Sequence, residues 1–247
     1  MTARHYTRGM HSEDSETSHR TGWAVLACFA LLLALAALRP LAVPDEGRYG
    51  DIGRWMLQSG DWLTPRLNGI PFFHKPPYLY WLEAAAMAVL GVHAWALRWV
   101  TALHALLMLV VMWQVARRWG GPALAHRAVW MLGSSLAFLM GGQYVNHDML
   151  VASWMSVAIF CLGWSFEQGR ERPHVGWALS GVLACALGVL SKGLIGLLLP
   201  GLVLVLWLTL TRQWRKVAYF PWLRGTALFL AVALPWFLLA HQAHPDM

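Results

Sequence analysis

Residues 23–43 read WAVLACFALLLALAALRPLAV, and this stretch decides the fold class. At 1.5 Å per residue it is long enough to cross the hydrocarbon of a bilayer as a helix, and it is too long for the core of a signal peptide. No small-residue cleavage site lies near its end, so we expect a membrane anchor that stays attached. The chain around it has the same character, because 58% of its 247 residues are hydrophobic, 13% are charged and the mean hydropathy is +0.48. Those proportions exclude a soluble globular domain and a disordered chain.

Six further apolar runs are long enough, or nearly so, to span a bilayer. They cover residues 95–116, 123–141, 149–166, 175–191, 194–210 and 225–240. We therefore predict an all-α, polytopic membrane protein with about seven transmembrane helices within residues 23–247. A shorter run, residues 78–92, carries Glu83 and has the length of an interfacial or re-entrant helix. The polar residues 1–22 are expected to form a disordered tail.

The basic residues orient these runs. If residues 78–92 do not span, twelve Lys and Arg residues share the side of the N-terminal tail and five lie opposite. Such an excess marks the cytoplasmic side, so the tail is predicted to be cytoplasmic and residues 44–92 to form the first periplasmic loop. If residues 78–92 do span, the same rule is satisfied with the N-terminal tail on the opposite side of the membrane. We favour the first topology because a segment of this length is expected to be interfacial.

The preferred topology brings four polar segments to one face of the membrane. They are residues 44–92, 142–148, 190–193 and 241–247. Most of the basic residues outside these segments lie in short clusters between apolar runs, where they act as topology signals. No nucleic-acid partner is therefore predicted.

Two carboxylates open the first outer loop. Asp45 and Glu46 follow the first span directly and can serve as a general base, a metal ligand or an electrostatic anchor. Asp45, which follows Pro44, can equally cap the next helix. The helical spacing of apolar residues over 46–58 predicts a short helix in the headgroup plane, ended by Gly60.

Cationic residues on the same face can bind a phosphate. Lys75 lies on a backbone stiffened by the two prolines that follow it, and Arg48 offers a planar fork of donors. Both can also bind anionic lipid headgroups without specificity. Lys192 interrupts two apolar runs, where snorkelling to the interface is the simpler alternative. Asp148 lies so close to the bilayer that either a functional role or a cap for the next helix is expected.

Six motifs carry a resemblance to a known family from about residue 40 onward. They are PDEGRY (44–49), SGDWLTPRLNG (59–69), FFHKPPYLYW (72–81), NHD (146–148), LSKGLIGLLLPG (190–201) and HPD (244–246). They resemble the polyprenyl-phosphate-dependent membrane glycosyltransferases of the GT-C fold, which include the lipid A aminoarabinose transferases and, more distantly, the protein O-mannosyltransferases. The resemblance implies a multi-pass protein of the bacterial inner membrane with its active site at the periplasmic face. There it would move a sugar from an undecaprenyl phosphate donor to a lipid A-like, other envelope or protein acceptor, with inversion.

The resemblance also implies roles for named residues. In that family, acidic residues matching Asp45 and Asp148 line the cavity, and a lysine matching Lys75 approaches the lipid phosphate. With their neighbours they make two sets of candidates. The catalytic candidates are Asp45, Glu46 and Asp148, and the candidates for binding the lipid phosphate are Lys75, Arg48, Tyr49 and Lys192.

A divalent metal is permitted by the sequence. Where the family has Glu-Lys-Pro, this chain has His74-Lys75-Pro76, and the family glutamate contributes to a metal site. Histidine is itself a zinc ligand, so His74 is the candidate for Zn²⁺, Mg²⁺ or Mn²⁺. No fixed spacing of ligands such as HExxH accompanies it.

Two other classes of protein fit parts of the pattern. A transporter would place broken helices and polar residues at mid-membrane, and Pro200 and Pro235 interrupt two of the apolar runs. A noncatalytic membrane scaffold would tolerate substitution of the loop acids. The chain ends just after the seventh run, with Pro245 and Asp246 opening what resembles another outer loop, so we expect an N-terminal portion of something longer.

Overall fold

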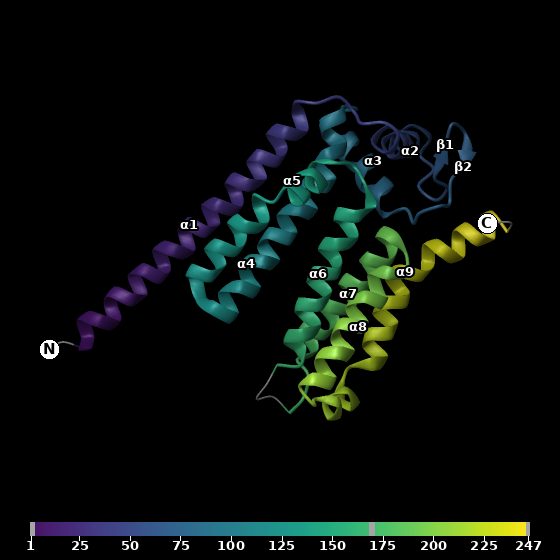
Figure 1. Ribbon diagram of the computed structural model, residues 1–247. Coiled ribbons are helices and arrows are strands. Elements are labelled where there is room, and N and C mark those ends of the chain that lie inside the picture. The colour runs from purple at the N-terminus through teal and green to yellow at the C-terminus, as the bar shows by residue number, and fades with distance from the viewer. Residues whose placement is uncertain (1–2, 168–170, 246–247) are drawn as a thin grey trace.

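A computed structural model describes residues 3–167 and 171–245 as an almost entirely helical protein (Figure 1). The helices are α1 (Ala3–Ala37), α2 (Asp45–Ser59), α3 (Tyr78–Leu90), α4 (Ala94–Gly133), α5 (Leu136–Gln143), α6 (His147–Ser165), α7 (Val175–Lys192), α8 (Ile195–Leu210) and α9 (Trp222–Ala243), with a 3₁₀ helix at Trp214–Tyr219. Two short antiparallel strands, β1 (Arg66–Leu67) and β2 (Ile70–Pro71), form a hairpin between α2 and α3.

One group of helices consists of α1, α4 and α5. Helix α4 consists of two arms that meet at Gly120 and Gly121, whose backbone is not helical and where Gly121 takes a positive φ of 76° that suits glycine. The arm before this point packs against α1 through the Phe29 and Trp99 rings, whose centroids are 5.9 Å apart. The arm after it returns along α1, so α4 is a helical hairpin rather than one long rod.

The second group consists of α6 to α9, drawn in green to yellow in Figure 1. The pairs α6–α7, α7–α8 and α7–α9 are all packed together. Helices α7 and α8 approach closely at Gly188 and Gly196, where neither residue has a side chain to keep the two backbones apart. This contact closes a tight hairpin whose turn contains Gly193.

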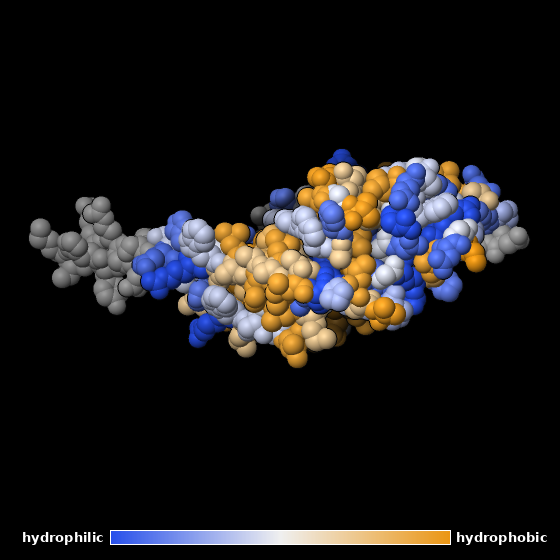
Figure 2. Space-filling view, turned by 90° about the horizontal axis from the view of Figure 1, so that it is seen from above, coloured by the Kyte–Doolittle hydropathy of each residue, from blue (hydrophilic) through white to orange (hydrophobic). Residues whose placement is uncertain are grey.

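Helices α2 and α3 lie at one end of both groups, at the top of Figure 1, and their interfacial placement in a membrane stays a prediction. They share a buried core that includes Ile52, Met56, Leu79 and Met87. Helix α2 ends where the sequence predicts, because Gly60 adopts a left-handed φ of 72° and its N–H bonds to the Met56 carbonyl. Seen from above in Figure 2, hydrophilic residues gather toward α2 and the strands on the right and again beside the grey atoms on the left, and apolar residues are prominent between these two regions.

Five helices of the described residues are long and apolar enough to cross a membrane. They comprise residues 14–37 of α1 together with α4, α6, α7 and α9. Helix α8 is shorter, but five leucines at every fourth position of its sequence are each more than half exposed, as expected for a face turned to lipid. They are Leu194, Leu198, Leu202, Leu206 and Leu210. The protein is therefore a multi-pass membrane protein.

The count of seven spans stays a prediction. The run 95–116 is the first arm of α4, whereas the run 123–141 is divided between the second arm and α5 by a break at Ser134 and Ser135. The side chain of Ser135 caps α5 by accepting from the Phe138 N–H, so it begins a new helix there. A hydropathy pattern alone does not reveal such a break, because the residues on both sides of it are apolar.

The structure differs from the sequence prediction at the N-terminus. Residues 1–22 were expected to be a disordered tail, but α1 begins at Ala3 and continues without interruption into the first span. Within the part whose side chains are described, Arg20 bonds to Glu16 one turn earlier at 2.6 Å, a pair that supports a helix. Residues 1 and 2 lie outside the described residues.

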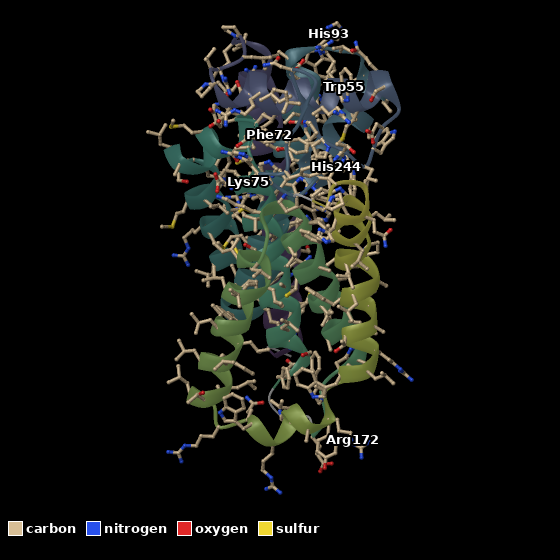
Figure 3. All side chains as sticks on the ribbon, turned by 90° about the vertical axis from the view of Figure 1, so that its right-hand side faces the viewer. Trp55, Phe72, Lys75, His93, Arg172 and His244 are labelled. Carbon is tan, nitrogen blue, oxygen red and sulfur yellow. The ribbon has the colours of Figure 1, made fainter. Side chains whose placement is uncertain are left out.

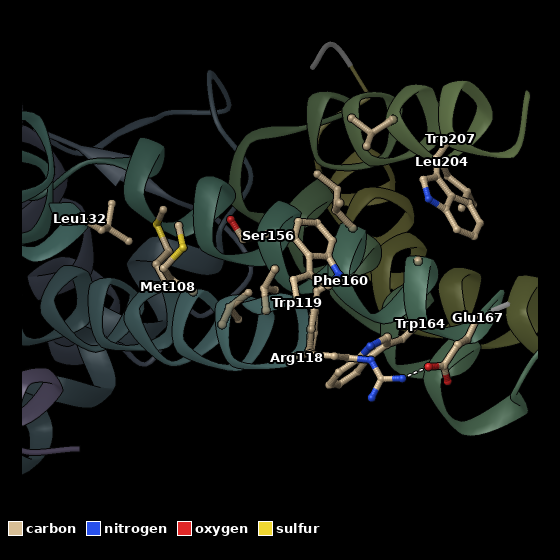
Figure 4. Close-up of a pocket in the computed structure, with 16 residues that line it drawn as sticks. Met108, Arg118, Trp119, Leu132, Ser156, Phe160, Trp164, Glu167, Leu204 and Trp207 are labelled. Atoms are coloured by element: carbon tan, nitrogen blue, oxygen red, sulfur yellow. Dashed lines mark ion pairs between the residues drawn. The ribbon is translucent and has the colours of Figure 1, made fainter. Parts of the chain in front are cut away.

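A cavity of about 910 Å³ lies between α4, α6 and α8, lined mainly by apolar side chains such as Met112, Phe160 and Trp207 (Figure 4). An ion pair between Arg118 and Glu167 bounds it, and Arg118 also lies over the Trp164 ring. Both charged residues come from the end of the molecule opposite to α2 and α3. The cavity is therefore separate from the polar segments that the sequence singles out.

Candidate functional site

The four polar segments expected on one face meet at one end of the helices, the last of them as far as residue 245, since residues 246 and 247 lie outside the described residues. The first loop contacts the end of α9 through Thr64 and His244, whose Oγ1 and Nε2 are 3.1 Å apart. The start of α6 contacts the end of α7 through Asp148 and Lys192. Figure 3 shows Lys75 and His244 at this end, with Arg172 at the other.

Glu46 is the best-connected carboxylate in this region. Arg98 donates to it from Nε at 3.0 Å and Nη2 at 2.8 Å, and Arg39 donates from Nη1 at 2.6 Å and Nη2 at 3.0 Å. The backbone N–H groups of Ala42 and Val145 complete the shell at 2.7 and 3.1 Å. This one side chain therefore ties α2 to α1, α4 and the loop before α6.

The surroundings of Glu46 fix its charge. Burial raises the pKa of the carboxyl, but the hydrogen bonds from Arg98 and Arg39 and from the two backbone groups outweigh it and lower the pKa to about 2. Both oxygens are occupied and the side chain is fully buried. The sequence offered Glu46 as a catalytic candidate, and the structure instead gives it the role of an electrostatic anchor.

Asp45 has the opposite environment from its neighbour. Its side chain is 38% exposed and carries a loose ion pair with Arg48 at 3.6 Å. Tyr144, from the loop before α6, donates to its other oxygen at 3.5 Å. Asp45 is the first residue of α2, and no side chain caps that helix, so the alternative role as a cap is not observed. An accessible carboxylate next to a cation suits contact with a polar substrate.

Three aromatic rings join α2 and α3 to the start of α6. The His147 ring lies edge-on to Tyr49, with centroids 4.9 Å apart, and to Tyr80 at 5.4 Å. Burial raises the pKa of the Tyr49 phenol, as do the nearby charges of Asp45 and Asp148, whereas Arg48 opposes them. Carboxylates from two distant parts of the sequence therefore act on the same hydroxyl.

Asp148 and Lys192 form an ion pair across the junction of α6 and α7. The Asp148 side chain is 66% exposed and that of Lys192 is 29% exposed, so the pair faces solvent. The cap of α6 is Asn146, whose side-chain oxygen accepts from the N–H groups of Asp148 and Met149 at 2.9 and 3.2 Å. The carboxylate of Asp148 therefore does not cap α6. Lys192 pairs with this carboxylate, so its role is not limited to snorkelling toward the membrane interface.

Lys75 approaches the same cluster from the loop between β2 and α3. Pro76 and Pro77 are buried behind it and fix the backbone from which the half-buried lysine extends. Lys75 acts electrostatically on the His147 ring, as do Lys192 and Asp148. Arg48 lies over the Tyr49 ring, with its Cζ 5.9 Å from the ring centroid, and Lys192 follows Ser191, whose carbonyl contacts His147. Two of the cations proposed for phosphate therefore lie beside these rings, and Lys75 acts on the His147 ring electrostatically.

The metal prediction is not confirmed. His74 is exposed and stacks on Phe72, with ring centroids 4.7 Å apart and planes within 20°. Within residues 3–167 and 171–245, no three His, Cys, Asp or Glu side chains are grouped so as to hold a metal ion. Because His74 belongs to no such group among these residues, we assign no step to a metal.

Sequence reasoning missed two of the central polar residues. Arg39 lies within the first apolar run, and its charge was the available signal, since an arginine inside an apolar segment is expected to pair with a carboxylate. Glu83, on α3, is fully buried and neither oxygen has a hydrogen-bond partner among the described residues. Burial raises the pKa of its carboxyl well above the usual range, and the Glu46 charge adds to this. Glu83 therefore holds its proton more readily than an exposed glutamate does.

The accessible part of the cluster can bind a phosphodiester. Three cations are available to neutralise an anionic group, and two exposed carboxylates, Asp45 and Asp148, lie beside them. Lipid-facing helices surround this end, so a ligand with an apolar tail can reach it from the bilayer. The arrangement suits a charged headgroup carried on a lipid.

Comparison with known proteins points to the same kind of ligand. Residues 21–247 match the family described as dolichyl-phosphate-mannose-protein mannosyltransferase. Undecaprenyl phosphate-α-4-amino-4-deoxy-L-arabinose arabinosyl transferases from Pseudomonas aeruginosa and Edwardsiella ictaluri are each 33% identical, over 93% and 91% of this chain. The matches cover 42% and 41% of those proteins, so the chain spans less than half the length of the curated relatives.

Solved structures agree with the sequence comparison. The chain is similar to ArnT from Cupriavidus metallidurans bound to undecaprenyl phosphate, with a TM-score of 0.80 and 32% identity over 92% of this chain and 42% of that one. The apo structure of the same protein gives a TM-score of 0.81. Because the family match extends over residues 21–247, nearly the whole chain, this protein belongs to the dolichyl-phosphate-mannose-protein mannosyltransferase family of membrane glycosyltransferases.

Proposed function

We propose that this chain forms the N-terminal part of a bacterial inner-membrane glycosyltransferase that takes a sugar from an undecaprenyl phosphate donor. The acceptor is a lipid A-like molecule of the cell envelope, and transfer takes place at the periplasmic face with the N-terminus in the cytoplasm. The names of the relatives support 4-amino-4-deoxy-L-arabinose as the sugar. A related structure that holds undecaprenyl phosphate supports the lipid carrier.

The observation that carries the proposal is the grouping of Arg48, Lys75 and Lys192 near the His147 and Tyr49 rings at one end of lipid-facing helices. Transfer breaks the bond between the anomeric carbon and the phosphate, so negative charge develops on the departing undecaprenyl phosphate. Cations held in place before the reaction stabilise that charge in the transition state. We assign this role to the three basic side chains.

The two exposed carboxylates have a different role in this proposal. Asp45 and Asp148 lie beside the cations without being buried, so they can orient the sugar or the acceptor. A hydroxyl acceptor would lose its proton to one of them as it attacks the anomeric carbon. A phosphate acceptor is already an anion and needs no base. Attack from the face opposite the leaving phosphate inverts the anomeric carbon.

The family description raises a second acceptor, the hydroxyl of a protein side chain. The donor chemistry is the same in both cases, so the two candidate functions differ only in the acceptor that receives the sugar. A transporter and a noncatalytic scaffold are disfavoured because the polar residues described above gather at one end of the helices, whereas transporters place their sites near the middle of the membrane.

The test is transfer by membranes that contain the full-length protein. We expect release of undecaprenyl phosphate from a labelled undecaprenyl phosphate sugar when a lipid A-type acceptor is present. Label in the lipid fraction supports the lipid acceptor, and label in protein supports the second candidate. Donor that remains intact with both acceptors, in membranes where the protein is abundant, would overturn the proposal.

A further inference from the structure

His147 stands out as a buried polar side chain to which the proposed function gives no task. It is the first residue of α6, next to Asp148, and its side chain is only 2% exposed. Its Nδ1 lies 2.7 Å from the backbone carbonyl oxygen of Ser191. A carbonyl only accepts, so Nδ1 must be the donor, and Nε2 is buried without a partner among the described residues. The ring is therefore held by a single directed bond.

That bond ends beside a residue of the proposed site. Ser191 is followed by Lys192, the last residue of α7, and Gly193 then takes a left-handed φ of 83° as the chain leaves the helix. A bond to the Ser191 carbonyl therefore fixes the last turn of α7. It also fixes the point from which Lys192 extends toward Asp148.

The same ring fixes the other side of the site. Its edge contacts with Tyr49 and Tyr80 involve α2 and α3, so a single imidazole of α6 contacts three other helices, α2, α3 and α7. Tyr49 directly follows Arg48, the cation that pairs with Asp45. The position of the ring thus sets the separation between the cation on α2 and the cation on α7.

We propose that His147 is a positioning residue that holds Lys192 and Arg48 at the spacing needed to bind one polyprenyl phosphate headgroup. This inference rests on the proposed function for its ligand. The ring makes no contact with the lipid in this account. It acts through the Ser191 carbonyl on one side and through the Tyr49 ring on the other.

The alternative is that His147 only fills space in the core. Two substitutions separate these roles. His147→Asn keeps an N–H close to the place of Nδ1 but loses most of the ring, and His147→Phe keeps a ring against the tyrosines but has no donor. If the bond to Ser191 positions Lys192, asparagine restores binding and phenylalanine does not.

His104 supplies a matched control. It is also buried, at 7% exposed, and its Nδ1 lies 2.7 Å from a backbone carbonyl, that of Val100. That carbonyl belongs to the same helix and carries no residue of the site. His104→Phe therefore removes a bond of the same kind without moving Lys192.

The experiment measures equilibrium binding of undecaprenyl phosphate to the full chain, and turnover at saturating donor. We expect His147→Phe to weaken binding about tenfold, because it leaves a buried carbonyl unpaired and frees the end of α7. Turnover at saturating donor should fall as well, because a displaced Lys192 no longer stabilises the departing phosphate, whereas His147→Asn and His104→Phe should keep both binding and turnover within about threefold of the unmodified protein. Unchanged binding by His147→Phe, or equal losses in the Asn and Phe variants, would overturn the inference.

Hydrogen exchange separates failure of this inference from failure of the proposed function. His147→Phe should speed amide exchange over residues 191–194, whereas His147→Asn should not. If the unmodified protein does not bind undecaprenyl phosphate at all, the proposed ligand is wrong, whatever the exchange shows. If it binds and neither binding nor exchange changes in His147→Phe, the positioning role is wrong.

Discussion

Glu46 and Arg98 form a bidentate ion pair in which neither side chain has any exposed surface. Arg98 also donates to the carbonyl oxygens of Ala36, Arg39 and Pro40 at 2.6 to 2.8 Å, so its three nitrogen atoms all have acceptors. The pair joins the end of α1, the start of α2 and the start of α4. One buried charge pair thereby ties the start of α2 to two membrane helices.

Removing one charge of this pair should destabilise the protein without touching the proposed site. We expect Glu46→Gln to cost about 3 to 5 kcal/mol, because it leaves the Arg98 guanidinium buried without a counter-charge. This loss of stability should appear as a large fall in the thermal unfolding midpoint of Glu46→Gln in detergent. Asp45→Asn is the matched control, since this neighbouring carboxylate is 38% exposed, and its midpoint should hardly change. Equal midpoints for the two variants would contradict the anchor role.

The proposed donor site predicts a different pattern for activity. Lys75→Ala should lower turnover at least about 100-fold, the usual effect of deleting one group that stabilises developing negative charge. Asp45→Asn should abolish transfer as well, while both proteins remain inserted and abundant. Arg54→Ala is the control, because Arg54 is an exposed basic residue of the same loop that pairs with Asp51 at 2.5 Å. Full activity of Lys75→Ala or Asp45→Asn would remove that residue from the site.

Glu83 makes a prediction that depends on pH. Its pKa is raised in the folded protein by burial and by the Glu46 charge, so folding takes up a proton at pH values between the normal pKa of a glutamate and this raised pKa. Stability from this residue is therefore present at low pH and is lost as the pH rises. Glu83→Gln removes that loss and should raise the free energy of unfolding by about 1 to 2 kcal/mol at pH 8, with no gain near pH 4.

Chemical unfolding of the purified protein at the two pH values measures this difference. Glu171→Gln is the control, since Glu171 is exposed, and it should change stability at neither pH. A Glu83→Gln variant that is less stable than the parent at pH 8 would mean that the ionised carboxylate is the stabilising form.

Much of the architecture follows from the sequence because each membrane helix is recognisable from its own continuous apolar run. Apolar runs and glycine punctuation were sufficient to find α1, α6, α7, α8 and α9 and the end of α2 at Gly60. The direction of the runs then placed the polar segments at one end. Contacts between residues far apart in the sequence could not be predicted from these local signals.

Glu46 shows what was out of reach. From the sequence it equals Asp45 as a candidate base, since both are carboxylates just outside the first span. Only the fold reveals that Arg39 and Arg98 occupy one of them and leave the other exposed. The same applies to His147, whose task depends on α2, α3 and α7 meeting around it.

The predicted topology can be tested by labelling. Ser59 lies at the end of α2 and Arg172 at the opposite end of the molecule, and both are exposed. A membrane-impermeant maleimide added to intact spheroplasts should label Ser59→Cys and not Arg172→Cys, and permeabilisation should expose the second. The three native cysteines, Cys28, Cys161 and Cys185, are buried, so the unmodified protein serves as the blank. If only Arg172→Cys were labelled in intact spheroplasts, the orientation of the protein would be the opposite of the predicted one.

The contact between α7 and α8 gives a prediction about stability that is independent of the proposed activity. A methyl group added at Gly196 would lie against the backbone carbonyl of Gly188, and a backbone cannot rotate away as a side chain can. We expect Gly196→Ala to separate the two helices and to cost about 2 kcal/mol or more. Gly201→Ala, one to two turns along the same helix, meets nothing within 4 Å and should be neutral or slightly stabilising, because alanine favours a helix over glycine. The thermal midpoints of the two variants should be measured side by side. Helix propensity alone predicts a higher midpoint for both variants. Only a close backbone contact predicts a lower midpoint for Gly196→Ala and an equal or higher one for Gly201→Ala.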